Sequence, residues 1–106
     1  MGDKLVQFEM TAPMALKILR EVAKDSERVF PTDHCEKQLA KRKISRTQVL
    51  RCLLRGNIVE GPSLSLKGNW EMAVETMTAG NAIRVACALD KDEKGDFIIV
   101  ITAYYV

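Results

Sequence analysis

The first half of the chain places apolar residues at the spacing of a helix face. Thr11 can cap a helix and Pro13 is tolerated in a first turn, so the pattern predicts a helix that begins here. Its apolar face consists of Ala15, Ile18, Leu19, Val22 and Ala23. Thr32 and Ser45 are the expected N-caps of two further helices, over Asp33–Lys43 and Arg46–Arg55. The residues between the first two helices, 28–31, are expected to be extended because Pro31 disfavours a helical Phe30.

After Gly56, which ends the third helix, the pattern changes to that of strands. Turn residues separate four segments, over 58–60, 70–77, 83–89 and 97–104. The last two are nearly all apolar, which predicts central strands that are covered. Helices followed by strands indicate an α+β fold, with N-terminal helices packed on a C-terminal antiparallel sheet of about four strands.

The size and composition fit one domain. The chain has 106 residues, 47% of them hydrophobic, so we expect a lead-in at 1–10 and a single domain at 11–106. No apolar run is long enough for a membrane span, and a cytoplasmic location is expected. Three scattered cysteines, Cys35, Cys52 and Cys87, are typical of free buried thiols. Cys35 follows His34, but no metal-ligand spacing accompanies the pair, and we predict neither a metal nor a cofactor.

Charge is distributed unevenly along the chain. The net charge is +2, yet the segment from His34 to Arg55 holds seven Lys or Arg and one acid. Such a block is either an anion-binding face or two solvated helix surfaces. Within it His34, Gln38 and Arg42 follow at four-residue steps and are predicted to form one row of polar tips.

Two residues of the strand region have alternative interpretations. Arg84 is the one charge in an apolar strand, so it needs a partner such as Glu71, Glu75 or an outside anion. Trp70 alternates in step with the apolar residues of its strand, which favours a core or sheet-edge anchor over a platform for stacking bases. The second and third helices could imitate a helix-turn-helix, although the strands that follow do not suit one.

Several motifs resemble a bacterial and phage family known only as a domain of unknown function. They are Phe30-Pro-Thr-Asp-His34, Arg42-Lys-Ile44-Ser45-Arg-Thr-Gln-Val49, Gly56-Asn-Ile-Val-Glu60-Gly and Lys67-Gly-Asn-Trp70, within a similarity that covers about residues 12–104. Members of that family usually have arginines four and eight residues after the histidine. This sequence has Gln38 at the first of those positions, which removes a positive charge. The family is distantly similar to RelE and BrnT type ribonuclease toxins.

The resemblance implies a toxin-like domain that acts on or binds RNA, with a metal-independent mRNA endoribonuclease as its activity and an antitoxin as partner. It implies His34, Arg42, Arg84 and Tyr104 as catalytic candidates. Histidine suits acid or base catalysis, and guanidinium matches phosphate oxygens. Residues for contacting RNA or an acidic partner are Gln38, Lys41, Arg46, Arg51, Arg55 and Lys67.

The alternative is a catalytically inactive protein, of phage or mobile-element origin, that engages a host protein or nucleoprotein through the basic helices. Gln38 favours this alternative, whereas the retained His34 favours the enzyme. A homodimer would be sought at the apolar stretch from Phe97 to Ala103, if that stretch formed a sheet edge.

Overall fold

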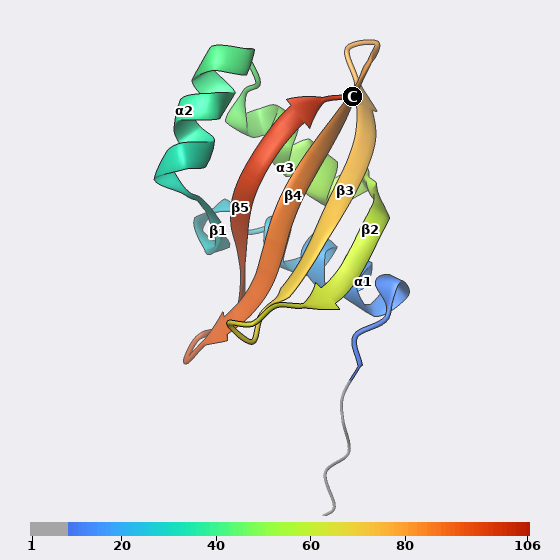
Figure 1. The fold of residues 1–106 in the computed structure, drawn as a ribbon, viewed down its shortest axis with the longest axis vertical. Coiled ribbons are helices and arrows are strands. Elements are labelled where there is room, and N and C mark those ends of the chain that lie inside the picture. The colour runs from blue at the N-terminus through green and yellow to red at the C-terminus, as the bar shows by residue number, and fades with distance from the viewer. Residues whose placement is uncertain (1–8) are drawn as a thin grey trace, which may run out of the picture.

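The computed structural model describes residues 9–106 and contains three α-helices followed by a sheet (Figure 1). The helices are α1 (Ala12–Ala23), α2 (Asp33–Arg42) and α3 (Arg46–Arg55), with a short 3-10 turn η1 (Ser26–Arg28). The strands are β1 (Val29–Pro31), β2 (Asn57–Leu64), β3 (Trp70–Thr78), β4 (Asn81–Asp92) and β5 (Gly95–Tyr105). Thr11, Thr32 and Ser45 each accept a backbone N–H bond at a helix start, which confirms the three expected N-caps. The α+β prediction is thus correct, and the part of the expected lead-in at residues 1–8 lies outside the described residues.

The sheet has five strands in the order β1-β5-β4-β3-β2, so the expected count of four was wrong. The additional strand is β1, whose residues Val29–Pro31 pair in parallel with Ile98, Ile99 and Val100 of β5. All other neighbours are antiparallel, which makes the sheet mixed. Three residues are too few for an alternating pattern, and the extended segment at 28–31 was therefore not recognised as a strand.

Helices cover one face of the sheet (Figure 1). On that face β4 contributes Ile83, Val85, Cys87 and Leu89 to the core, where they meet the apolar sides of α1 and α3. The alternate residues of β4 point to the opposite face. Among residues 9–106 no helix lies on that opposite face, which we call the open face. β4 and β5 are central, as expected, but they are covered on one face only.

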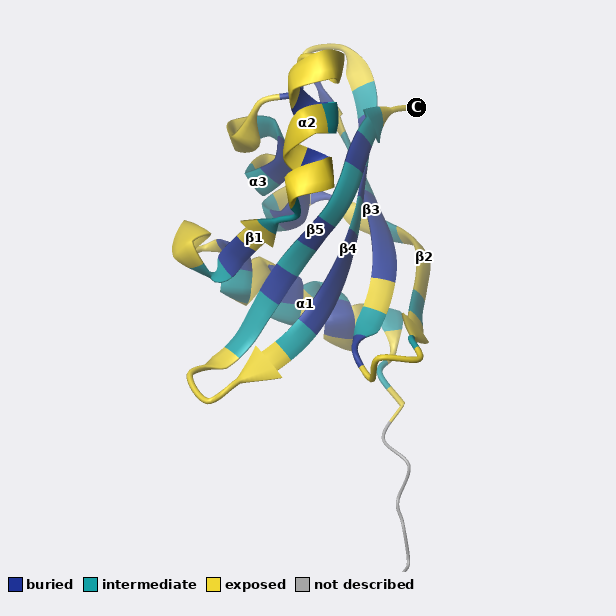
Figure 2. Cartoon of the chain, turned by 60° about the vertical axis from the view of Figure 1, so that its left-hand side comes forward, coloured by how far each residue is buried: buried dark blue, intermediate teal, exposed yellow. Residues whose placement is uncertain are grey.

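α2 takes a different place from α1 and α3, because it lies beside β5 where β1 has ended (Figure 2). Cys35 and Leu39 are its buried residues, and the rest of its surface is exposed or half-buried. β1 pairs with Ile98–Val100, so this part of the apolar stretch 97–103 is not a sheet edge, and beyond it α2 lies along β5. The site suggested for a homodimer is therefore not available as an edge.

The three cysteines are free and buried, as predicted. Burial raises the pKa of the Cys52 and Cys87 thiols to about 12 each and also raises the pKa of Cys35. These thiols are therefore packing groups. None of the helices within residues 9–106 has the length and apolar character to cross a lipid bilayer.

Candidate functional site

The candidate site is a strip along the junction of α2 and β5. The amide N–H of Thr32 donates to the Val100 carbonyl at 3.1 Å, at the start of α2. At the other end the Tyr105 hydroxyl donates to the Lys43 carbonyl at 3.5 Å. α2 therefore runs in the same direction as β5. Four residues of the helix and two residues of the strand span a similar length, so side chains at these spacings lie next to one another.

Gln38, Arg42 and Thr102 form a hydrogen-bonded group at the centre of this strip. The Arg42 Nη1 donates to Gln38 Oε1 at 3.0 Å, to Thr102 Oγ1 at 3.1 Å and to the Ala103 carbonyl at 2.8 Å. The Thr102 hydroxyl also donates to Gln38 Oε1. Arg42 thus donates to a carbonyl on the edge of β5 that β1 leaves unpaired. This bond gives Arg42 a structural role in addition to any chemical role.

His34 lies one helical turn before Gln38, on the same stripe of α2. Its side chain is exposed, and it makes no hydrogen bond or ion pair within residues 9–106. Because Arg42 reaches back to Gln38, its guanidinium lies about one turn, or roughly 6 Å, from the His34 position. The Nε and Nη2 groups of Arg42 make no bond within that part of the chain and can donate outward. The predicted polar row therefore exists, with two of its members bonded to each other.

Arg84 lies beside this strip, on the open face. It pairs across the strands with Tyr104 and Glu75, and its Nε and Nη2 donate to Glu75 Oε1 at 3.0 and 2.8 Å. The Glu75 carboxylate, followed by the Tyr104 hydroxyl, raises the pKa of Arg84. Glu75 was one of the partners expected from the sequence, and this contact is confirmed. The pairing also compensates the charge that Arg84 would offer to a phosphate.

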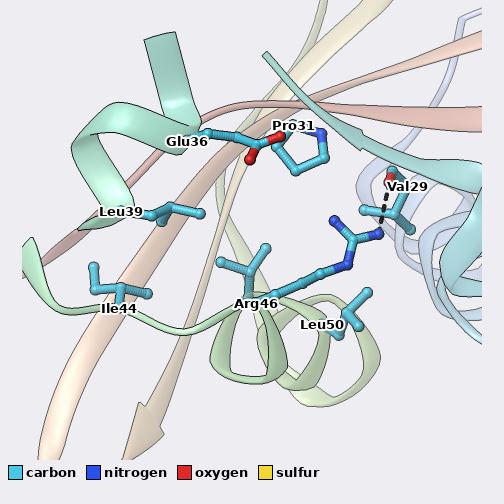
Figure 3. Close-up of a pocket in the computed structure, with 8 residues that line it drawn as sticks. Val29, Pro31, Glu36, Leu39, Ile44, Arg46 and Leu50 are labelled. Carbon is cyan, nitrogen blue, oxygen red and sulfur yellow. Dashed lines mark hydrogen bonds between the residues drawn. The ribbon is translucent and has the colours of Figure 1, made fainter. Parts of the chain in front are cut away.

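The remaining basic candidates do not form one surface. Arg46, at the start of α3, directs its Nη2 to the carbonyls of Ser26 and Val29, at 2.8 and 3.0 Å. A small cavity of about 200 Å³ lies between β1, α2 and α3. Arg46 and Glu36 both line it (Figure 3). Arg46 therefore ties α3 to the segment that precedes α2.

The other candidates are exposed and dispersed. Lys41 lies on α2, and Arg51 and Arg55 on α3. Lys67 lies in the loop before Trp70. Trp70 is paired with Leu89, and Leu89 is five residues from Arg84 on β4. That separation is about 17 Å along the sheet, so Lys67 and Arg84 do not belong to one site.

The sequence reasoning did not identify Thr102, which joins α2 to β5. A signal was present, because Thr102 is the only polar residue in the apolar stretch from Phe97 to Ala103. A register shift between Ala86 and Cys87 in the β4–β5 pairing accompanies it and leaves Ile101 unpaired. The bulge directs Thr102 to the open face, and strand alternation alone does not predict that shift. Trp70, by contrast, packs against the core as expected.

Within residues 9–106 no three His, Cys, Asp or Glu side chains converge as metal ligands would. Comparison with known proteins gives one positive finding, which is that the family model "Domain of unknown function (DUF4258)" matches residues 32–105. That range begins at the cap of α2 and includes the whole α2–β5 strip. No curated protein and no solved structure matches the chain significantly.

Proposed function

Because the chain belongs to the DUF4258 family, to which no activity is assigned, we propose from its own residues that it is a toxin-like domain that cleaves RNA. One observation carries the proposal. The exposed His34 shares one stripe of α2 with Arg42, whose Nη1 donates to the carbonyl of Ala103, the residue before Tyr104. The RelE-type likeness inferred from the sequence motifs is part of the same proposal.

The reaction that suits these groups needs no metal. The 2′-oxygen of a ribose attacks the adjacent phosphorus while a base removes its proton, and the 5′-oxygen leaves as it receives a proton from an acid. The products are a 2′,3′-cyclic phosphate and a 5′-hydroxyl. His34 is the proposed base, and water is the proposed acid for the leaving 5′-oxygen. Tyr104 lies four residues beyond Val100, about 13 Å from the start of α2, and is proposed to stack on a neighbouring base of the RNA. The outward-facing groups of Arg42 stabilise the charged phosphorane.

The strip also has the dimensions for a single RNA strand. His34 and Arg42 are eight residues apart, which is about 12 Å along the helix. Lys41 lies on the same helix and can neutralise a neighbouring phosphate. Arg84 contributes less, because Glu75 compensates its charge.

The pairing of Arg84 with Glu75 specifically favours a second candidate, a catalytically inactive binding protein. Gln38 supports the same alternative, since its amide oxygen serves Arg42 and Thr102 and it contributes no positive charge. Loss of one stabiliser of an oxyanion lowers a rate by about 10²–10³. A weakened site on an intact fold then binds its target through α2 without cleaving it.

Induced expression in bacteria tests the two candidates. The set comprises the wild type, His34→Ala, Arg42→Ala and Gln38→Arg, with Arg51→Ala as a control for removal of an exposed arginine outside the strip. A ribonuclease is expected to arrest growth and to leave 2′,3′-cyclic phosphate ends on cellular RNA, and His34→Ala abolishes both effects while Arg51→Ala abolishes neither. Arrest by Gln38→Arg alone supports the inactive binding protein. If no protein of the set arrests growth or cuts RNA, the ribonuclease proposal is wrong.

A further inference from the structure

A shallow groove of about 510 Å³ crosses the open face of the sheet. It adjoins the α2–β5 strip, because Ala86 in the groove is paired with Thr102. Its floor is made by Ala73 of β3 and Ala86 of β4, which are directly paired. Ala88 continues this row of small residues along β4. Glu60, Ser63, Glu71 and Ile101 rise around the floor. Ala86 is half-buried and forms the accessible part of the floor, whereas Ala73 and Ala88 are 4% and 2% exposed.

The groove is acidic, and its acids lack partners. Glu60 and Glu71 are exposed and make no ion pair or side-chain hydrogen bond within residues 9–106. Glu60 is opposite Ala73, two residues from Glu71, so the Cα atoms of the two glutamates lie on a diagonal of about 7–8 Å. Two like charges on such neighbours repel each other and favour a cation from outside.

The backbone of β2 places these acids at the groove. The β2–β3 register shifts on both sides of Glu60, and Gly61, which lies in the second of these shifts, has a φ of +80°. A Cβ at Gly61 would lie 2.6 Å from the Glu71 carbonyl oxygen, so only glycine permits this approach of β2 to β3. Bulges of this kind redirect side chains, and here Glu60 and Ser63 both face the groove.

We propose that this groove is the docking surface for a cationic amphipathic helix of a partner protein. A helix is about 10 Å wide and can lie over Ala86, while Lys or Arg residues at positions i and i+4, about 6 Å apart, reach the exposed Glu60 and Glu71. Apolar residues on the same helix face cover Ile101. In a second copy docked sheet to sheet, the same carboxylates would face those of the first copy. RNA would place its negative phosphates next to them. Both are therefore disfavoured at this surface.

The test is selection of a displayed library of helical peptides on the full-length protein. Enriched peptides are expected to carry two Lys or Arg residues three or four positions apart beside an apolar stripe. By fluorescence anisotropy, a selected peptide should bind Glu60→Gln/Glu71→Gln at least tenfold more weakly than wild type. Ala86→Leu, which fills the floor, should weaken binding as well. The charge-matched control Glu27→Gln/Glu93→Gln removes two exposed acids elsewhere and should leave the affinity within twofold.

Three results overturn the proposal. They are a selection that enriches no cationic helix, peptides that bind the groove variants as tightly as wild type, and equal weakening by the Glu27/Glu93 control, which would indicate general charge attraction. Concentration-dependent self-association that Glu60→Gln/Glu71→Gln abolishes would assign the groove to a second copy. The assay contains no RNA, so its outcome is independent of the proposed ribonuclease activity.

Discussion

The α2–β5 strip and the open-face groove both carry polar side chains at the surface, but they differ in how those side chains are bonded. In the strip Arg42 makes bonds to two side chains and one carbonyl, so removing it disturbs the fold as well as any site. In the groove Glu60 and Glu71 have no bonded partner within residues 9–106. The difference indicates that groove residues can be changed at little structural cost. The effects of groove variants on binding should therefore be easier to interpret than those of strip variants.

The largest expected contrast is between two alanines on opposite faces. Ala103 is fully buried beneath the helices, whereas Ala86 forms the groove floor. Ala103→Leu overfills the core and should lower the free energy of unfolding by about 1–3 kcal/mol. Ala86→Leu extends into the open groove and should change it by less than about 0.5 kcal/mol. Urea unfolding measures both, and equal losses would show that the groove is not open.

Arg42→Ala should destabilise the domain by about 1 kcal/mol, because it leaves the Ala103 carbonyl without this donor and removes one of the two donors to Gln38 Oε1. Arg51→Ala is the matched control, since Arg51 is exposed and bonds to no other part of the described chain. Its unfolding free energy should stay within about 0.5 kcal/mol of wild type. If the two variants unfold alike, the strip contributes nothing to stability, and a loss of function in Arg42→Ala reports chemistry alone.

The pair between Arg28 and Asp92 should make stability depend on pH. Arg28 Nη2 and Nη1 donate to the two Asp92 oxygens at 2.8 and 3.2 Å, and this contact holds the pKa of Asp92 below its ordinary value. A lowered folded-state pKa adds stability that is present above about pH 4 and is lost as the pH falls through the folded value. In Asp92→Asn the melting temperature should be lower at pH 7 and should fall less toward pH 2. Parallel curves for the variant and wild type would contradict the contact.

The smallest effect is expected at the groove acids themselves. Glu60→Gln/Glu71→Gln relieves a repulsion and should leave the unfolding free energy unchanged or raise it by up to about 0.5 kcal/mol. Any gain should disappear in 1 M salt, where charges are screened within about 3 Å. Thermal unfolding at low and high salt measures this, and a clear loss of stability would mean that the acids have structural partners.

Sequence patterns predicted the helices well because their signals are local. A cap residue and an apolar face at 3.6-residue spacing are enough to place α1, α2 and α3. The end of α3 at Gly56 was also correct, although Gly56 does not have the left-handed conformation in which glycine usually closes a helix. Gly56 has a φ of −77°, which any residue adopts, and a Cβ there would lie 2.6 Å from the Cys52 carbonyl oxygen and 2.7 Å from Val74 Cγ1. The glycine is required by packing of α3 against β3 and not by its conformation.

Features that depend on distant parts of the chain were harder to predict. The pairing of β1 with β5 joins residues about seventy positions apart, and no local pattern indicates it. The basic block appeared as one surface in the sequence, yet Arg42 is directed to β5 and Arg46 to η1 and β1. The groove was not predicted from the sequence. Its acids come from two strands whose pairing contains bulges, and alanines such as those of its floor give no signal in a sequence.

An NMR titration of the labelled protein with a short single-stranded RNA tests the central claim most directly, because it shows which of the two regions the RNA contacts. Our account predicts shifts at His34, Gln38, Arg42 and Tyr104, with the methyl signals of Ala73 and Ala88 on the open face unchanged. His34→Ala and Arg42→Ala should reduce those shifts, and Arg51→Ala should not. Shifts confined to the groove around Glu60, Glu71 and Ala86, or no shifts at RNA concentrations that saturate basic RNA-binding domains, would contradict the assignment of the strip to RNA.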